Sequence, residues 1–166
     1  PVTAILTFVV VAPIAEEFIF RRLLLDRVRI FGDGAAILIG GAAFGLFHGN
    51  LNQTLYAFVL GAVFSAIVLL TNRLRYTIGI HMLINGISVL TTLVESDLLD
   101  YLLACVILFS ICFSVVLFFV RRKHYTLEPG PLPFSRAEKA HACFTSPWVW
   151  ILLVGGLAYS GVSIFL

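Results

Sequence analysis

Two adjacent carboxylates, Glu16 and Glu17, stand inside an apolar run that is otherwise typical of a membrane-spanning helix. They are the only ionisable side chains between Pro1 and Phe20. A charged side chain at membrane depth costs about 2.5–3.5 kcal/mol or more, and it is generally kept for function with a specific partner. The chemistry of this chain therefore depends on which groups approach these two glutamates.

The two glutamates face different directions on their helix. Glu17 precedes Arg21 by one helical turn, with the acid on the N-terminal side, which is the better orientation for an ion pair. Glu16 lies about 100° around the helix from Glu17, because an α-helix has 3.6 residues per turn, so it needs a different partner. We therefore predict that Glu17 and Arg21 support the structure and that Glu16 serves the chemistry.

Three further polar side chains are expected at membrane depth: His48, His81 and Asn85. His81 and Asn85 are four residues apart and share one face of their helix. A buried carboxylate can act as a general base, an imidazole can orient a water molecule, and a second imidazole with an amide can donate hydrogen bonds to an oxyanion. These groups form a complete set for the attack of water on a peptide carbonyl without a nucleophilic Ser or Cys.

The composition predicts the elements that carry these side chains. Of 166 residues, 60% are apolar and only 12% are charged, whereas a soluble domain has about a quarter charged residues. We therefore expect an all-α fold, a polytopic transmembrane helix bundle. The net charge of +2 is too small, and its basic residues too scattered, to indicate nucleic-acid binding. The three cysteines show no Cys-x-x-Cys spacing, so neither a disulfide framework nor a cysteine metal site is supported.

About six membrane segments are expected, at 1–25, 35–48, 53–71, 77–94, 101–120 and 147–166. The segment at 35–48 is short for a bilayer that needs about 20 residues, so we expect it to be tilted, extended at its ends or to stop partway across. Small residues at four-residue spacing favour close helix packing: Gly41, Gly45 and Gly49 in one segment, and Ala57, Gly61 and Ser65 in the next.

Pro13 lies one turn before the glutamates. A proline there either kinks the helix or starts a second helical piece. In both cases backbone carbonyls near Val9 lose their usual partner, which is tolerated at membrane depth only beside protein or a wet cavity.

We divide the chain into a helical core at 1–121, a polar Pro-containing cytoplasmic loop at 122–146 and a C-terminal transmembrane helix at 147–166. Lys and Arg gather near 21–34, 72–76 and 121–139, and loops rich in these residues are cytoplasmic. The chain begins without Met and ends inside an apolar run, so we expect a part of a longer protein with further helices on its flanks.

The polar residues fall into three short motifs on separate apolar segments: Glu16-Glu17-x-x-x-Arg21, Phe44-x-x-x-His48 and His81-x-x-x-Asn85. In this order they resemble the motifs of the CPBP/Abi family, the type II CAAX prenyl endopeptidase-like intramembrane glutamate proteases. The resemblance covers about residues 5–95. It implies that a glutamate activates water, that one histidine shares this water, and that a histidine and an asparagine stabilise the oxyanion. The catalytic residues that it implies are Glu16, His48, His81 and Asn85, with Glu17 and Arg21 as structural support.

The resemblance also implies the partners and the location. We expect a peptide or membrane-protein substrate in the lipid bilayer, no cofactor and no nucleic acid. In the eukaryotic branch the substrate is a prenylated protein, whereas bacterial members are linked to bacteriocin immunity or peptide maturation. We expect an integral protein of the bacterial plasma membrane with its basic loops in the cytoplasm.

Other interpretations stay open at this point. A zinc-dependent hydrolase is one, because a glutamate and two histidines can ligate zinc, although no His-Glu-x-x-His motif occurs. A non-catalytic scaffold or immunity protein and a proton-coupled transporter are two more. Depth is a difficulty for the shared site: His81 lies only about 6–9 Å into a helix that begins at Thr77, whereas Glu16 and His48 lie near 20 Å. Either that helix begins earlier or the segment boundaries differ.

Overall fold

The computed structural model describes residues 2–94, 96–131, 133–147, 150–151 and 154–155. These residues form helices joined by turns and one extended linker, and no strand occurs among them, which confirms the all-α fold. Three of the described helices are long and apolar enough to cross a membrane: Val2–Phe31, Gln53–Thr71 and Leu74–Leu93. The count of six segments stays a prediction, and most of the segment expected at 147–166 lies outside the described residues.

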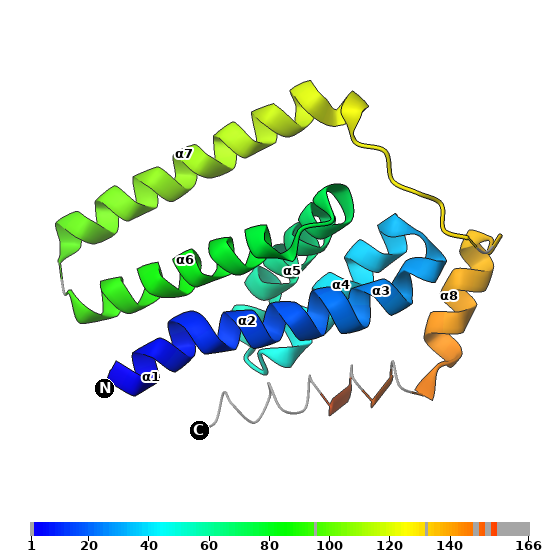
Figure 1. The fold of residues 1–166 in the computed structure, drawn as a ribbon, viewed down its shortest axis with the longest axis horizontal. Coiled ribbons are helices and arrows are strands. Elements are labelled where there is room, and N and C mark those ends of the chain that lie inside the picture. The colour runs from blue at the N-terminus through cyan, green and yellow to red at the C-terminus, as the bar shows by residue number, and fades with distance from the viewer. Residues whose placement is uncertain (1, 95, 132, 148–149, 152–153, 156–166) are drawn as a thin grey trace. The chain divides into compact units, whose positions relative to one another are not determined.

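The chain forms two compact units, residues 1–15 with 78–126 and residues 16–77 with 127–166. The first helical run passes from one unit into the other and contains two π-helical turns (Figure 1). Its elements are α1 (Val2–Leu6), η1 (Thr7–Val11), α2 (Ala12–Glu17), η2 (Phe18–Leu24), α3 (Leu25–Val28) and the 3₁₀ turn η3 (Arg29–Phe31). Turns of the π type are rare, occur mostly inside α-helices and are frequent at functional sites.

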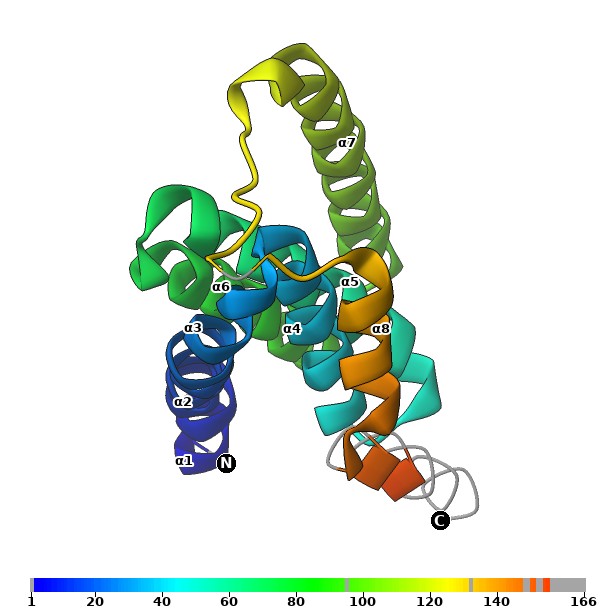
Figure 2. The ribbon, with the colours of Figure 1, turned by 90° about the vertical axis from the view of Figure 1, so that its right-hand side faces the viewer.

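In the second unit, α4 (Asp33–Phe47) packs against α5 (Leu51–Thr71), and the two helices lie side by side in Figures 1 and 2. The predicted small residues form this contact. A Cβ atom on Gly41 would lie 2.8 Å from the carbonyl oxygen of Phe58, and one on Gly61 would lie 3.1 Å from the Cα atom of Gly41. The backbones therefore approach so closely that only glycine fits.

Helix α4 has 15 residues and is about 22 Å long at 1.5 Å per residue. It begins two residues before the predicted segment, so its N-terminal end is extended, and it ends at Phe47 with His48 as its C-cap. Gly49 follows with a φ of 59°, a left-handed conformation that glycine adopts without strain. The turn into α5 therefore comes directly after His48.

The core of this unit lies between η2, α4 and α5. Phe20 and Phe44 are buried and pack edge to face, with ring centroids 5.2 Å apart. A neighbouring cluster of buried residues contains Leu25, Ala36 and Val68. These contacts fix the rotation of the three segments about their own axes, which in turn sets where their polar side chains point.

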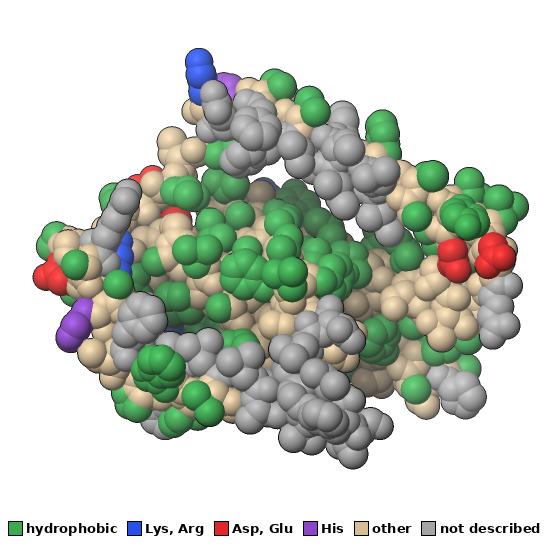
Figure 3. All heavy atoms as spheres, turned by 180° about the vertical axis from the view of Figure 1, so that it is seen from behind, with side chains coloured by type: hydrophobic (Ala, Val, Ile, Leu, Met, Phe, Trp, Pro, Cys, Tyr) green, Lys and Arg blue, Asp and Glu red, His purple; other side chains and the backbone are tan. Residues whose placement is uncertain are grey.

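The other unit contains most of α6 (Leu74–Leu93) together with α7 (Asp97–Arg121) and the turn η4 (Arg122–His124). Helix α6 begins at Leu74, three residues before the predicted start, and this places His81 about 10 Å from the helix start. Large apolar side chains such as Leu83 and Leu93 stay exposed, and Figure 3 shows hydrophobic side chains over much of one face. Exposed apolar surface marks contact with a membrane or another protein, and α6 is long and apolar enough to cross a membrane.

The segment predicted as a loop at 122–146 contains a helix, α8 (Arg136–Thr145), at the end of the linker (Figure 2). A capping box starts this helix. The Ser135 hydroxyl accepts a hydrogen bond from the Glu138 backbone N–H at 3.2 Å, and the Glu138 carboxylate accepts one from the Ser135 N–H at 2.7 Å. The spacing Ser-x-x-Glu is a known sequence signal for a helix start. The prolines just before it favour the prediction of a loop over that of a helix.

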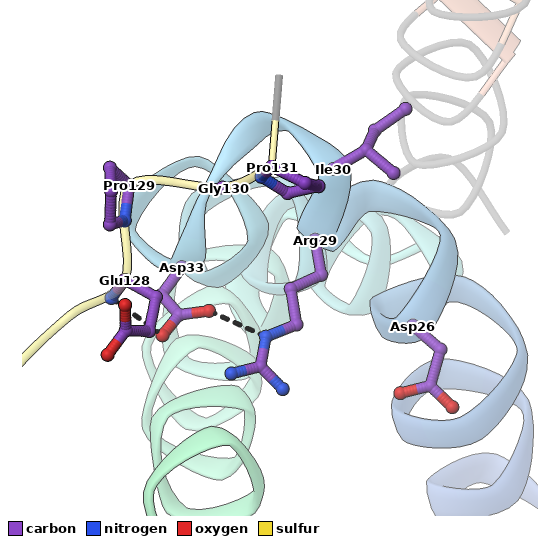
Figure 4. Close-up of a pocket in the computed structure, with 8 residues that line it drawn as sticks. All are labelled: Asp26, Arg29, Ile30, Asp33, Glu128, Pro129, Gly130 and Pro131. Carbon is purple, nitrogen blue, oxygen red and sulfur yellow. Dashed lines mark hydrogen bonds and ion pairs between the residues drawn. The ribbon is translucent and has the colours of Figure 1, made fainter. Parts of the chain in front are cut away.

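Residues 127–131, which we call the strap, dock on the turn between η3 and α4 (Figure 4). The Asp33 N–H donates to the Glu128 carbonyl at 2.9 Å, and the Glu128 N–H donates to the Asp33 carboxylate at 3.0 Å. Asp33 also accepts a hydrogen bond from Arg29 at 2.8 Å. Beside the strap lies a cavity of about 450 Å³, whose lining residues are Asp26, Arg29, Ile30, Asp33, Glu128, Pro129, Gly130 and Pro131.

Two glycines allow the strap to dock, and replacing Gly130 with alanine tests this. Gly130 has a φ of 84°, and a Cβ atom on it would lie 2.6 Å from the Gly32 backbone nitrogen. Because the new side chain is strained and blocked, we expect docking to weaken by about 1–3 kcal/mol, so hydrogen exchange at the Asp33 N–H should become faster. The matched control is Gly34→Ala, since nothing lies within 4 Å of a Cβ atom there. Equal exchange in the two variants would contradict the docking role.

The capping box of α8 predicts a pH dependence. Hydrogen bonds from the side chain and backbone of Ser135 hold the pKa of the Glu138 carboxyl below its ordinary value. A lowered pKa means that the carboxylate form favours the helix, so its stabilisation is present above the ordinary pKa and is lost as the pH falls through the lowered one. We expect a carboxyl NMR titration to give a higher pKa for Glu138 in Ser135→Ala than in the wild type. Identical titration curves would contradict the capping box.

Candidate active site

The predicted ion pair between Glu17 and Arg21 is present. The Arg21 Nε atom donates to Glu17 Oε2 at 3.1 Å, and both side chains are fully buried. Taking both charges out of water is costly, and the attraction compensates only when further hydrogen bonds satisfy the remaining polar atoms. The stability of this buried pair therefore depends on the groups that surround Arg21.

Arg21 is enclosed by groups from three segments. Its Nη1 atom donates to the Ser65 hydroxyl of α5 at 3.3 Å. Its guanidinium carbon lies 5.0 Å from the Phe44 ring centroid and 5.8 Å from that of Phe64, and an arginine over an aromatic face is attracted to it. A Cβ atom on Gly40 of α4 would lie 2.5 Å from the Ser65 hydroxyl oxygen, so only glycine leaves room for this contact.

His48 is held by the helix that precedes it. Its Nδ1 atom lies 2.8 Å from the Phe44 carbonyl oxygen, and its ring packs edge to face on the Phe44 ring with centroids 4.7 Å apart. A carbonyl oxygen can only accept a hydrogen bond, so Nδ1 carries the proton. In a neutral ring Nε2 is then the hydrogen-bond acceptor.

Phe44 therefore joins the first two motifs. Its ring lies against the Arg21 guanidinium, and its carbonyl oxygen accepts the hydrogen bond from His48. The four-residue spacing from Phe44 to His48 has a structural reason, because a helix brings the carbonyl of the first residue to the side chain of the second.

Glu16 belongs to the same unit as Glu17, Arg21 and His48. It is half-buried, and its Oε2 atom is shielded from solvent. Arg21 attracts Glu16 electrostatically as well as Glu17, so the arginine influences both carboxylates rather than only the one with which it forms an ion pair.

His81 and Asn85 belong to the other unit. His81 is 4% exposed. The Asn85 side-chain amide donates to the Phe8 carbonyl oxygen in η1 at 2.9 Å, so Asn85 joins α6 to the first helical run. The roles of all six predicted site residues stay predictions, while the structure brings the Glu17–Arg21 pair and the Phe44–His48 pair into contact.

Some contacts in this region go beyond what the sequence predicts. The small-residue repeat predicts Ser65 only as a packing residue, whereas its buried hydroxyl accepts a hydrogen bond from Arg21. Pro13 predicts backbone carbonyls without their usual partner near Val9, but no sequence pattern identifies Asn85 as the donor to Phe8 or predicts the π-helical turns. Among the described residues, no three His, Cys, Asp or Glu side chains form a group that could hold a metal ion.

Comparisons with known proteins agree with the family that the motifs resemble. Residues 1–87, just over half of the chain, match a family model described as type II CAAX prenyl endopeptidase Rce1-like, and this range contains every predicted site residue. Over 97 residues the chain is 29% identical to the membrane-embedded CAAX protease MroQ of Staphylococcus aureus (strain USA300). This alignment covers 54% of the chain and 39% of that relative, so the chain spans well under half the relative's length. No solved structure matches the chain.

Replacing Arg21 with methionine tests the importance of the buried pair. The change leaves the Glu17 carboxylate buried without its cation, and we expect a loss of about 3–5 kcal/mol in the free energy of unfolding. Arg22→Met is the matched control, because Arg22 pairs with Asp26 at 3.6 Å while both side chains are half exposed, and such a pair contributes about 0–1 kcal/mol. Unfolding of the membrane-embedded protein by steric trapping measures both losses. Equal losses would contradict a special role for Arg21.

Proposed function

Because the chain belongs to the type II CAAX prenyl endopeptidase Rce1-like family, we propose that it is an intramembrane endopeptidase in which Glu16 activates the attacking water. The observation that carries this assignment is the buried ion pair of Glu17 with Arg21. It gives Glu17 a structural task and makes its neighbour Glu16 the candidate general base.

In the proposed reaction Glu16 takes a proton from a water molecule, and the water oxygen forms a bond with the carbon of the scissile carbonyl. His48 orients this water through Nε2, the acceptor atom that its Nδ1 hydrogen bond leaves available. The carbonyl electrons move to oxygen, and His81 and Asn85 donate hydrogen bonds to the resulting oxyanion. When the carbon–nitrogen bond breaks, the proton on Glu16 passes to the leaving amine. Glu17 and Arg21 keep the helix in place.

We propose a peptide or a membrane protein as the substrate, prenylated or not, and cleavage within the lipid bilayer without a cofactor. The family name and the relative's name both contain the term CAAX, which supports substrates of this class. The positions of Lys and Arg support basic loops that lie in the cytoplasm, and the bacterial relative supports a protein of the bacterial plasma membrane.

Glu16→Gln is the direct test. The amide cannot accept the proton from water, so we expect cleavage to fall by about 10²–10⁴-fold. Substrates that accumulate uncleaved can be identified by comparing the proteome of native membranes that contain the wild type with the proteome of membranes that contain this variant. Asp26→Asn is the matched control, because Asp26 is half exposed and lies outside the proposed site, and it should cleave like the wild type.

Three outcomes would contradict this proposal. Full cleavage by Glu16→Gln would show that Glu16 is not the base. Activity that a chelator abolishes and zinc restores would favour a metal-dependent hydrolase. A scaffold or immunity protein would be favoured if the wild type cleaves nothing and if Glu16→Gln and His48→Ala still protect cells against a bacteriocin.

A further inference from the structure

The π-helical turn η1 leaves one backbone carbonyl in need of a donor. The Ala12 N–H donates to the carbonyl of Thr7, five residues earlier, so it does not serve Phe8. In the same five-residue register the donor for the Phe8 carbonyl would be residue 13. That residue is Pro13, which has no N–H.

Asn85 supplies the missing donor. Its Nδ2 atom lies 2.9 Å from the Phe8 carbonyl oxygen, although the two residues are 77 positions apart. Both residues belong to the same compact unit. Next to Asn85, a Cβ atom on Gly86 would lie 3.7 Å from a methyl carbon of Val9, so α6 approaches this turn closely.

We infer that Pro13 is a positioning residue for Asn85: the proline leaves the Phe8 carbonyl open, and this carbonyl fixes the Asn85 amide. A carbonyl without a donor costs several kcal/mol at membrane depth, so the contact is retained. Because the carbonyl can only accept, the amide must present its nitrogen to it, which selects one of the two amide orientations.

One amide hydrogen then faces Phe8, and the direction of the second is fixed by the planar amide group. If the proposed function holds, the second N–H donates to the oxyanion; this role rests on the proposed function, whereas the hydrogen bond to Phe8 does not. Asn85 thus reaches its working orientation through a proline on another helix.

A cycle of variants in the full-length protein tests the coupling. Asn85→Ala removes the donor, and we expect the folding equilibrium constant to fall by about threefold, the average for a side-chain hydrogen bond in a membrane. In Pro13→Ala the N–H introduced at position 13 gives the helix a backbone donor for Phe8, so Asn85→Ala should then change the constant by much less. Ile14→Ala is the matched control, because Ile14 is 45% exposed and its backbone donor is unchanged. An equal loss in all three backgrounds would overturn the inference.

A second measurement holds even if Pro13→Ala fails to fold. With a ¹³C-labelled Phe8 carbonyl, the amide I band of the wild type should move to higher frequency in Asn85→Ala, because the carbonyl loses its hydrogen bond. An unmoved band would overturn the inference.

If wild type and Ile14→Ala cleave substrate, Pro13→Ala should lower kcat while leaving KM near its wild-type value. Absence of cleavage in the wild type would contradict the proposed function alone, since the band shift does not depend on catalysis.

Discussion

The packing of the helices in the second unit depends on one buried charge, the Arg21 guanidinium. A cation inside an apolar helix packing is tolerated only when several groups satisfy it together. Glu17 neutralises it, the Ser65 hydroxyl accepts its second hydrogen bond, and the Phe44 ring lies against it. These groups come from α2, α4 and α5, so the guanidinium, which itself belongs to η2, links the first helical run to both helices.

Glycine makes this arrangement possible. A methyl group at Gly40 would meet the Ser65 hydroxyl, and one at Gly61 would lie 2.7 Å from the Phe44 Cβ atom. The close approach of α4 and α5 therefore serves more than helix packing, since it brings Phe44 and Ser65 to Arg21. The same contact positions His48, because the Phe44 ring lies against Arg21 and the Phe44 carbonyl accepts a hydrogen bond from the His48 imidazole.

The contacts that depend on local spacing could be predicted from the sequence. The Glu17–Arg21 pair follows from four-residue helical spacing, and the meeting of Gly41 with Gly61 follows from the small-residue repeats. The π-helical turn η1 could not be predicted, because the donor that satisfies its Phe8 carbonyl, the Asn85 amide, lies 77 positions away in the sequence. The start of α8 was missed although its Ser-x-x-Glu signal is local. The roles of Glu16 and His81 stay predictions, since the two residues belong to different units.

The proline and the glutamates in the first helical run are connected by one physical rule. At membrane depth, irregular backbone is stable only where another group satisfies it, so a helix interrupted by proline requires a donor from a neighbour. The turn η1 meets this requirement through Asn85, and α2, which carries both glutamates, begins directly after it. On the far side of α2 the turn η2 again leaves the α-helical register, with the Leu25 N–H donating to Phe20, five residues earlier. The six residues of α2, which include Pro13 and both glutamates, therefore lie between two π-helical turns, and the first of these turns is satisfied by a side chain from α6.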